Sequence, residues 1–446
     1  MLRNAALVIA LLSLGAVICL DRGFAAKLAT ERDLLHRKVD LLTGENERLR
    51  GLVVAEQKER NQAKTRAQRT EIERQVELIR GLKFKQPVVY AEVSRAKIKE
   101  VISQMLADAY TEREFQQMAA AFAQLGVLPK GFPLRQKYID LLGEQIAAFY
   151  DQHQHKLFMF EDASLENQQN CIILAHELTH ALQDQHYGLS RLPLEIKNDD
   201  DRALASSALV EGDATLVMTA YMLRNISLRT LKDNVAASLG QDMGQIQKAP
   251  RYLRELLVFP YLRGQEFCGS MVNGDDYSGL ARCYAHLPAS TAQILHPEKY
   301  LAQPAEEPIA VGWPAADFDG EKAEVSNVLG EIGVRIQLAE SIDEKQAERV
   351  AGQWRGDRYL SFLAHDALVW KTVWATQRDA EEFFAAEQLA LENRYQLAHA
   401  APSSAAFHAD GRRSLRLLRY ENEPAVLLID APAPDAAEKL TAKYAR

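Results

Sequence analysis

The segment HELTH at residues 176–180 combines residue types that can bind and use a metal ion. If the segment is helical, His176 and His180 lie one turn apart on the same face and can direct both imidazoles at one ion. Glu177 is rotated by about a quarter turn from His176, which keeps its carboxylate off the ion but close to a metal-bound water. A carboxylate in that place can take the proton as the water attacks a carbonyl. The pattern therefore predicts a catalytic zinc site with Glu177 as the general base.

A mononuclear catalytic zinc usually takes three protein ligands, so a third ligand must come from elsewhere in the chain. His186 is in the position of the third ligand in HExxHxxGxxH, the metzincin pattern, whose glycine lets the chain turn sharply. Here that glycine is replaced by Gln183, and the sequence favours a continuous helix that points His186 away from the ion. Glu211 is the alternative, because LVEGDATL places one carboxylate in an apolar stretch, and a buried carboxylate needs a partner. The residues favour Glu211 as the third ligand, with a core glutamate paired with Arg202 as the structural alternative.

The apolar pattern indicates the elements that must position these residues. The zinc-motif helix is expected to start near residues 167–170 and to run through Ala181, and a second apolar helix spans about 203–223. The run LFMF at 157–160 is short, apolar and flanked by polar residues, which predicts a strand. Residues 87–300 are therefore expected to form a mainly helical domain with a small sheet.

The pattern changes after the proline-rich QPAEEP at residues 303–308. The expected elements are a helix near 343–353, strands at 358–362 and 367–375, a helix near 378–391, and a hairpin with strands at 414–420 and 425–430. We therefore expect an α+β fold in which a C-terminal α+β domain, residues 301–446, follows the helical zinc domain.

A few further residues are weaker candidates for a chemical role. His296 in ILHPEKY is a candidate catalytic residue, because it could donate a hydrogen bond to the oxyanion formed during attack on a carbonyl. Tyr150 and Tyr300 could do the same. His153 and His155 are most simply part of a polar loop, with an auxiliary metal site as the alternative. The sequence has neither a glycine-rich phosphate loop nor a serine-nucleophile elbow, which argues against those classes of enzyme.

HELTH followed by an EGDA helix resembles the gluzincins, the thermolysin-like class of zinc peptidases. The combination of FYD before a strand, HELTHALQDQH, VEGDAT and STAQILHPEKY is similar to a group of poorly characterised exported bacterial metallopeptidases. The resemblance covers roughly residues 87–300, and a weaker similarity extends to WRGDRYLSF and WKTVWATQRDAEEF.

This resemblance implies roles for particular residues. Both histidines of HELTH and Glu211 would be the zinc ligands and Glu177 the base, within a zincin-like fold. LFMF would be an edge strand that lines the cleft, where a peptide can add as another strand. The chain departs from the thermolysin pattern at Thr215, because that pattern has an aspartate four residues after the ligand glutamate. Asp213 is the nearest carboxylate that could orient a ligand histidine.

The first segment contains a long uncharged run. Residues 5–20 carry no charge, follow Arg3 and end before Asp21. Such a run is short for a membrane span and long for the core of a signal peptide, although the FAA that follows offers a cleavage site. Because a helical sequence continues directly after it, residues 1–26 are predicted to be an uncleaved, single-pass membrane anchor rather than a signal peptide. Either interpretation places the catalytic domain outside the cytoplasm, in the periplasm or the extracellular space.

Residues 27–86 carry a heptad pattern. Leucines recur every seven residues at one core position of the heptad, d: Leu28, Leu35, Leu42 and Leu49. The other core position, a, includes Val39, Asn46 and Val53. Leucine at d with valine and one asparagine at a is typical of a parallel two-stranded coiled coil, in which the asparagines pair and fix the register. A single amphipathic helix packed on the enzyme domain is the alternative. We expect a coiled-coil stalk that forms a homodimer.

Length and composition limit the remaining interpretations. With 446 residues the chain is long enough for two or three domains, and a formal net charge of −8 gives no sign of nucleic-acid binding. Cys268 and Cys283 flank MVNGDDYSG, and they either form a disulfide or remain buried thiols.

Together these patterns predict a membrane-anchored zinc metallopeptidase with Zn²⁺ held by His176, His180 and Glu211. Its partners would be a protein or peptide substrate, a second copy of the chain and the membrane, but no nucleic acid. Two other interpretations stay open. One is a non-catalytic coiled-coil scaffold stabilised by structural zinc, which would not need Glu177. The other is a zinc amidase or similar hydrolase acting on the cell wall.

Overall fold

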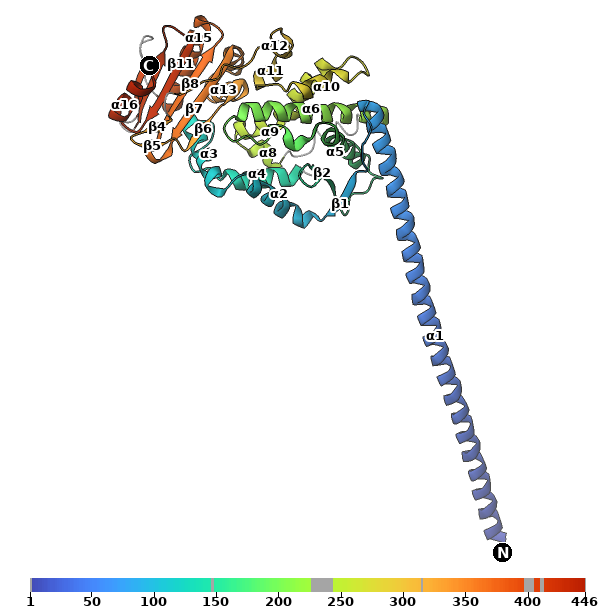
Figure 1. Ribbon diagram of the computed structural model, residues 1–446. Helices are drawn as coiled ribbons and strands as arrows, with labels where there is room; N and C mark the ends of the chain where they lie inside the picture. Colours follow the sequence, from blue (N-terminus) through green and yellow to red (C-terminus); the bar gives the residue numbers. More distant parts are fainter. Residues whose placement is uncertain are drawn as a thin grey trace. The chain divides into compact units, whose positions relative to one another are not determined.

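The structure is a computed structural model that describes residues 2–145, 148–225, 244–313, 316–396, 405–409 and 413–445. The chain divides into two compact units, Met1–Glu71 and Ile72–Arg446. Figure 1 shows the helices and strands of both units.

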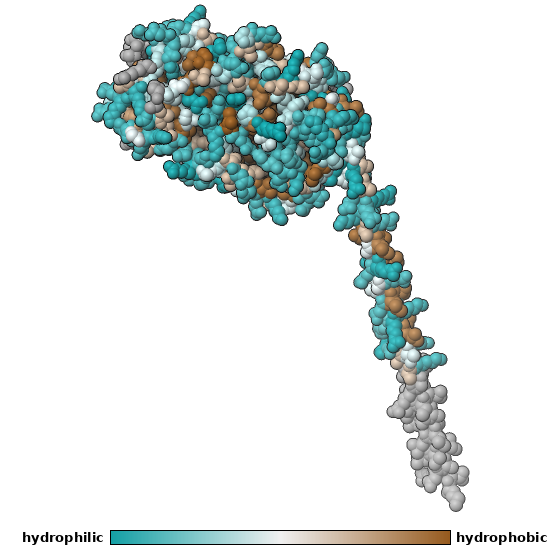
Figure 2. All heavy atoms as spheres, viewed as in Figure 1, coloured by the Kyte–Doolittle hydropathy of each residue, from teal (hydrophilic) through white to brown (hydrophobic). Residues whose placement is uncertain are grey.

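The first unit consists of helical residues of α1 (Leu2–Arg80). The four leucines at the predicted d positions, residues 28, 35, 42 and 49, are between 51% and 63% exposed. Figure 2 shows apolar residues along this helix among polar ones. These exposed leucines are the side chains that the predicted coiled coil would bury.

The prediction of a membrane anchor at residues 1–26 is wrong. Within the ranges that the structure describes, no helix is long and apolar enough to cross a membrane. The physical reason is length, because the uncharged run at 5–20 is shorter than the ~20 apolar residues that a helix needs to span the hydrocarbon core. The predicted location as a single-pass protein of the cell membrane is therefore wrong as well.

The first half of the second unit is mainly helical, after the last turns of α1. Its helices are α2 (Arg95–Ala109), α3 (Glu112–Leu125), α4 (Leu134–Gln145), α5 (Gln168–Tyr187), η1 (Leu189–Arg191), α6 (Asp200–Asn225), α8 (Gly244–Lys248), α9 (Arg251–Met271), α10 (Ser278–Ala285), α11 (Thr291–Leu295) and α12 (Pro297–Leu301). The two helices predicted for the zinc site are confirmed as α5 and α6. These two helices pack directly on each other.

A three-stranded sheet lies beside α5. Its order is β1 (Val89–Val93), β3 (Lys156–Phe160) and β2 (Ala148–Asp151), with β1 parallel and β2 antiparallel to β3. The strand predicted at LFMF is confirmed as β3, but its predicted place at the edge of the sheet is wrong. It is the central strand because β1, from before α2, pairs with its far side. The edge strand next to α5 is β2.

The C-terminal part of this unit is a six-stranded antiparallel sheet with helices on its faces. Its order is β6 (Val325–Asn327), β7 (Trp354–Phe362), β8 (Ala367–Trp374), β11 (Ala425–Ala431), β10 (Arg413–Arg419) and β9 (Ala405–Ala409). A two-stranded ribbon, β4 (Asp317–Phe318) and β5 (Glu321–Lys322), precedes it. The helices are α13 (Gly330–Ala339), α14 (Glu344–Ala351), η2 (Leu363–His365), α15 (Gln377–Tyr395) and α16 (Pro434–Tyr444). The expected α+β fold is confirmed.

Side chains alternate between the two faces of this sheet, as strand geometry requires. On one face, Trp370 and Trp374 of β8 pack against Phe383 of α15, with ring centroids 5.9 and 4.3 Å apart. On the other face, Leu427 of β11 belongs to a separate cluster with Leu440 of α16. Both faces are therefore covered, which explains why β11 is buried along its whole length.

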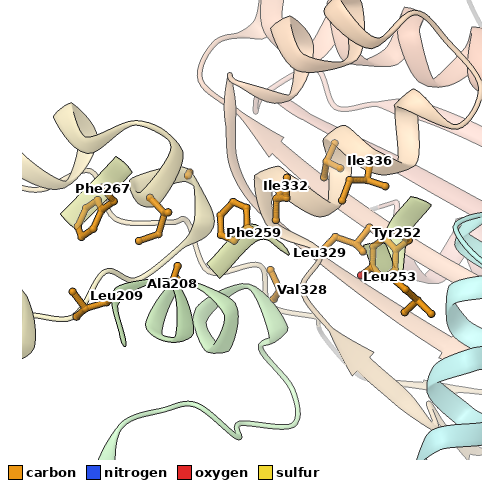
Figure 3. Packing of buried hydrophobic residues seen from close by; sticks show 14 of the residues in the cluster. Ala208, Leu209, Tyr252, Leu253, Phe259, Phe267, Val328, Leu329, Ile332 and Ile336 are labelled. Atoms are coloured by element: carbon orange, nitrogen blue, oxygen red, sulfur yellow. The ribbon is translucent and has the colours of Figure 1, made fainter. Parts of the chain in front are cut away.

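The core of the second unit joins its helical part to its sheet. Figure 3 shows Ala208 and Leu209 of α6, Phe259 of α9 and Ile332 of α13 within one cluster. The helices α6 and α9 approach very closely, because a Cβ added to Gly212 would lie 2.2 Å from the backbone of Gly264. Only glycine fits at such a crossing.

The two cysteines that flank MVNGDDYSG do not form a disulfide. Cys268 and Cys283 are both free and buried. The thiol of Cys268 faces the carbonyl oxygen of Leu209 at 3.5 Å. They are packing residues of α9 and α10.

The exposed stripe on α1 predicts that the chain dimerises through a parallel coiled coil with Asn46 at its interface. We expect a dimer in sedimentation equilibrium of the full chain. Replacing Asn46 with Leu should relax the register and add higher oligomers, because the buried amide pair that selects two strands is lost.

The matched control is Asn61→Leu, at an exposed position outside the predicted interface, which should leave the dimer unchanged. A monomer at every concentration would contradict the coiled-coil interpretation and favour a single amphipathic helix.

Candidate metal centre

The helix α5 is capped at both ends and continuous between them. The side chain of Asn167 accepts a hydrogen bond from the backbone N–H of Gln169 at 2.9 Å, and Gly188 ends the helix with a φ of 69°. The helix therefore runs past Gln183 without a turn, as the sequence predicts, and its HELTH residues are buried.

The three predicted metal ligands meet between α5 and α6. His176 Nε2 lies 3.1 Å from Glu211 Oε2 and 3.0 Å from His180 Nε2. His180 Nε2 lies 3.4 Å from the same carboxylate oxygen. Both histidines are buried, and 22% of the Glu211 side chain is exposed. Among the described residues, this is the one group of three or more His, Cys, Asp and Glu side chains whose ligand atoms converge in this way.

The spacing of these atoms suits one small ion. Zinc in a tetrahedral site has ligand bonds of about 2.0–2.2 Å, which places neighbouring ligand atoms about 3.3 Å apart. Two imidazoles and one carboxylate are a donor set of catalytic zinc sites, in which the fourth position is open. The residues present therefore fit a metal ion of this kind.

The electrostatics of the group favour positive charge between the three side chains. Burial alone would raise the pKa of Glu211, but the charges and hydrogen bonds of His180 and His176 outweigh it and hold that pKa far below its usual range. Burial alone would lower the pKa of His180, and the carboxylate of Glu211 instead raises it to about 9. Positive charge beside the Glu211 carboxylate thus stabilises its ionised form.

Glu177 follows His176 on α5, but its carboxylate is held by the sheet. Its Oε2 accepts a hydrogen bond from the backbone N–H of Tyr150 on β2 at 2.8 Å. Burial raises the pKa of Glu177, although the charges of His176 and His180 act in the opposite direction. Glu177 therefore stands beside the three converging side chains without joining them, as a general base would.

Gln183 is a part of the site that sequence reasoning did not assign. Its Oε1 lies 2.9 Å from His180 Nδ1, and its Nε2 donates to the backbone carbonyl of Val210 at 3.0 Å. The side chain is 1% exposed. One amide thus fixes the ring of His180 and ties α5 to α6 at the residue before Glu211. The signal in the sequence was a glutamine one turn after His180, on the buried side of the helix.

His186, the competing third ligand, is bound elsewhere. Its Nε2 lies 2.8 Å from the backbone carbonyl of Lys83, in the segment that follows α1. Because α5 continues to Tyr187, this imidazole is directed away from His176 and His180. The geometry agrees with Glu211 and not with the metzincin pattern.

The carboxylate near Glu211 does not orient a ligand histidine. Asp213 is fully buried and pairs with Arg80 at 2.8 Å, while Tyr284 donates its hydroxyl to it at 3.0 Å. Among the described residues, His176 Nδ1 has no hydrogen-bond partner. Asp213 instead links α6 to the end of α1 through its ion pair with Arg80. Glu211 is likewise not paired with Arg202, whose side chain is exposed.

His296 was a candidate for the oxyanion donor, and the structure places it beside α13. Its Nε2 lies 2.8 Å from Glu331 Oε1, and Lys299 approaches the other oxygen of that carboxylate at 3.4 Å. The hydrogen bond and charge of Glu331 raise the pKa of His296. These contacts give His296 a part in packing the helices α11 and α12 on α13.

The remaining candidates are also engaged by neighbours. Tyr150 donates its hydroxyl to Asp184 at 2.7 Å, and His155 Nδ1 lies 2.6 Å from the same oxygen. Tyr300 donates to a backbone carbonyl at 2.6 Å, and His153 lies 3.2 Å from a different carboxylate. The structure does not bring His153 and His155 together as a metal site within the part of the chain that it describes.

Tyr261 of α9 was missed, because nothing in its local sequence marks it. Its ring lies over that of His176, with centroids 6.0 Å apart and planes at 29°. It is 43% exposed, so it faces the solvent side of the site. The negative charge of Glu211, together with burial, holds the pKa of Tyr261 well above its usual value.

Comparison with known proteins adds one match. A family model described as a domain of unknown function, DUF8575, matches residues 318–441, the region of the six-stranded sheet. No curated protein and no solved structure matches the chain.

The geometry predicts which substitutions remove the metal. Glu211→Ala should lose zinc about as completely as His180→Ala, because each removes one of three converging ligands. His186→Ala should keep close to one zinc per chain, since its imidazole binds a backbone carbonyl. The measurement is zinc per purified chain, with circular dichroism to confirm folding. Zinc lost from His186→Ala but kept in Glu211→Ala would restore the metzincin interpretation.

A second prediction concerns the amide that orients His180. Gln183→Leu should lower zinc affinity about 10–100-fold in competition with a chelator, the usual effect of removing such a partner. Gln169→Leu, at an exposed position in the first turn of α5, is the matched control and should have no effect. Equal affinities for the two variants would show that Gln183 only packs.

Proposed function

We propose that this protein is a zinc-dependent peptidase that hydrolyses peptide bonds. The observation that carries the proposal is that His176, His180 and Glu211 converge while Glu177 is held apart from them on the same helix. A structural zinc site usually has four protein ligands and has no use for such a carboxylate. The same set of residues supports a zincin-like fold for the helical part of the second unit.

The roles of the side chains follow from their positions. A bound zinc ion would supply Lewis-acid chemistry by polarising the substrate carbonyl. Glu177 accepts the proton of the attacking water and returns it to the nitrogen of the leaving amine. The N–H of Tyr150 holds one oxygen of that carboxylate, which fixes the direction of the other. Gln183 keeps His180 in place throughout.

Tyr261 supports the proposal from the other side of the site. Its phenol is partly exposed, its ring lies over His176, and a tyrosine hydroxyl is ordinarily neutral at pH 7. A neutral hydroxyl in that place can donate a hydrogen bond to the oxyanion that develops as the carbonyl is attacked. Tyr261 is therefore a better oxyanion donor than His296, whose ring is held by Glu331.

The edge of the small sheet supports a peptide substrate. β2 is an edge strand, and it lies beside the helix that carries Glu177. An edge strand presents backbone donors and acceptors that an extended peptide can pair with. A substrate bound there would run past the carboxylate that Tyr150 positions.

The test is the variant Glu177→Gln. It should keep zinc near one per chain but reduce hydrolysis of an unfolded protein substrate by about 10²–10⁴-fold, because the proton acceptor is gone and the ligands remain. The control is Glu161→Gln, an exposed glutamate that follows β3. Full activity in Glu177→Gln would contradict the mechanism. An inactive wild-type protein that binds zinc would favour the scaffold interpretation.

A further inference from the structure

A cavity of about 500 Å³ opens beside the metal centre. Glu211 and Tyr261, which both contact the site, line one end of it. Most of the rest of its wall comes from α2, α3, α4, α6 and α9, and the remainder from Tyr110, Leu194, Ile196 and Leu329. The cavity is therefore placed to receive whatever is attached to a carbonyl bound at the metal centre.

The cavity is elongated along α6. Asp200, Ala203, Leu204, Ser207 and Glu211 all line it, and their spacing follows one face of the helix. At 1.5 Å per residue, the step from Glu211 back to Asp200 covers about 16 Å. The cavity is thus a channel that begins at a metal ligand and follows the helix for several turns.

The lining is mainly apolar. Its polar groups are those of Asp200, Ser207 and Glu211 on α6 and the hydroxyls of Tyr110, Tyr138, Tyr252 and Tyr261, and every other lining residue is aliphatic, phenylalanine, methionine or proline. The channel therefore favours an occupant that is apolar along most of its length.

This chemistry argues against a peptide backbone in the channel. An extended peptide of that length would bring about five peptide groups, at 3.3 Å per residue. The helices that form most of the wall already use their own backbone groups, so the N–H and C=O groups of a peptide would have few partners beyond the hydroxyls of Ser207 and the tyrosines. A single leucine or phenylalanine side chain would avoid that cost but would fill only the first part of the channel.

We propose that the channel binds the alkyl chain of an N-acyl amide whose carbonyl is at the metal centre. The substrate class would be fatty-acylated peptides or amino acids. This inference rests on the proposed function. Water adds to the acyl carbon, Glu177 takes its proton, the C–N bond breaks and the nitrogen receives that proton. The products are a fatty acid and a free amine.

The far end of the channel sets a length limit. Asp200 is at that end. Contact between the terminal methyl group of an alkyl chain and this carboxylate would add no favourable binding free energy. A fully extended chain advances about 1.2 Å per bond, from 3.3–3.6 Å per three-bond residue. The apolar stretch from Glu211 to Ala203, about 12 Å, therefore accommodates roughly ten carbons. Longer chains should gain little.

The first test measures binding and not turnover. The zinc-loaded Glu177→Gln variant is titrated by calorimetry with N-acyl-glycinamides from two to about fourteen carbons, spanning the ten-carbon limit. Affinity should rise about threefold to fourfold per methylene up to about ten carbons, then level off. An affinity that does not change with chain length would overturn the inference. So would an apolar hexapeptide that binds as tightly as the acyl amides and competes with them.

Substitutions in the channel locate the effect. Ala203→Phe should end the gain a few carbons below the ten-carbon limit and leave shorter chains unchanged, because the new ring occupies the channel two turns from Glu211. Ala385→Phe, at an exposed position of α15, is the matched control. Leu204→Asn is a smaller change that should lower long-chain affinity if Ala203→Phe does not fold. If affinity depends on acyl chain length in the same way in the control and in both channel variants, the inference is overturned.

Wild-type hydrolysis separates this inference from the proposed function. Cleavage of unacylated peptides with no dependence on acyl chains would overturn the channel assignment and leave the peptidase standing. Length-dependent binding of acyl amides with no hydrolysis of any amide would support the channel and overturn the peptidase.

Discussion

The relative position of α5 and α6 is the constraint on which the candidate metal centre depends. Two ligands come from one helix and the third from the other, so a slip of either helix by one residue would separate them. Gln183 fixes this relation, because its amide binds both the ring of His180 and the carbonyl of Val210. The close crossing at Gly212 then brings α9, with Tyr261, over the same site.

The C-terminal sheet takes part in positioning α6. Asp201, in the first turn of α6, accepts a hydrogen bond from the backbone N–H of Thr291 at 3.0 Å. Asp357 of β7 accepts hydrogen bonds from the backbone N–H groups of Leu329 and Gly330 at 3.0 and 2.9 Å. Burial raises the pKa of Asp201 to about 8. Asn327 of β6, within the region matched by the family model, accepts a hydrogen bond from the backbone N–H of Asp200 at 2.9 Å, which joins that region to the helix that carries Glu211.

Local pattern in the sequence was sufficient for features that depend on one helix or one strand. The spacing of His176 and His180, the helical context of Glu211 and the four central strands of the C-terminal sheet all follow from periodicity, whereas the edge strands β6 and β9 were not predicted. Features that depend on distant pairing were not predictable in this way. LFMF looked like an edge strand, but β1 covers its other side. Gln183 and Tyr261 acquire their roles from neighbours far away in the sequence. The uncharged run near the N-terminus resembled a membrane anchor, but it is too short for one.

The central claim is that one zinc ion is held by two imidazoles of α5 and a carboxylate of α6. X-ray absorption at the zinc edge of the loaded protein tests it most directly. The account predicts four nitrogen and oxygen neighbours at about 2.0–2.1 Å, with the scattering pattern of two imidazoles. Three imidazoles, or any sulfur neighbour at about 2.3 Å, would contradict it.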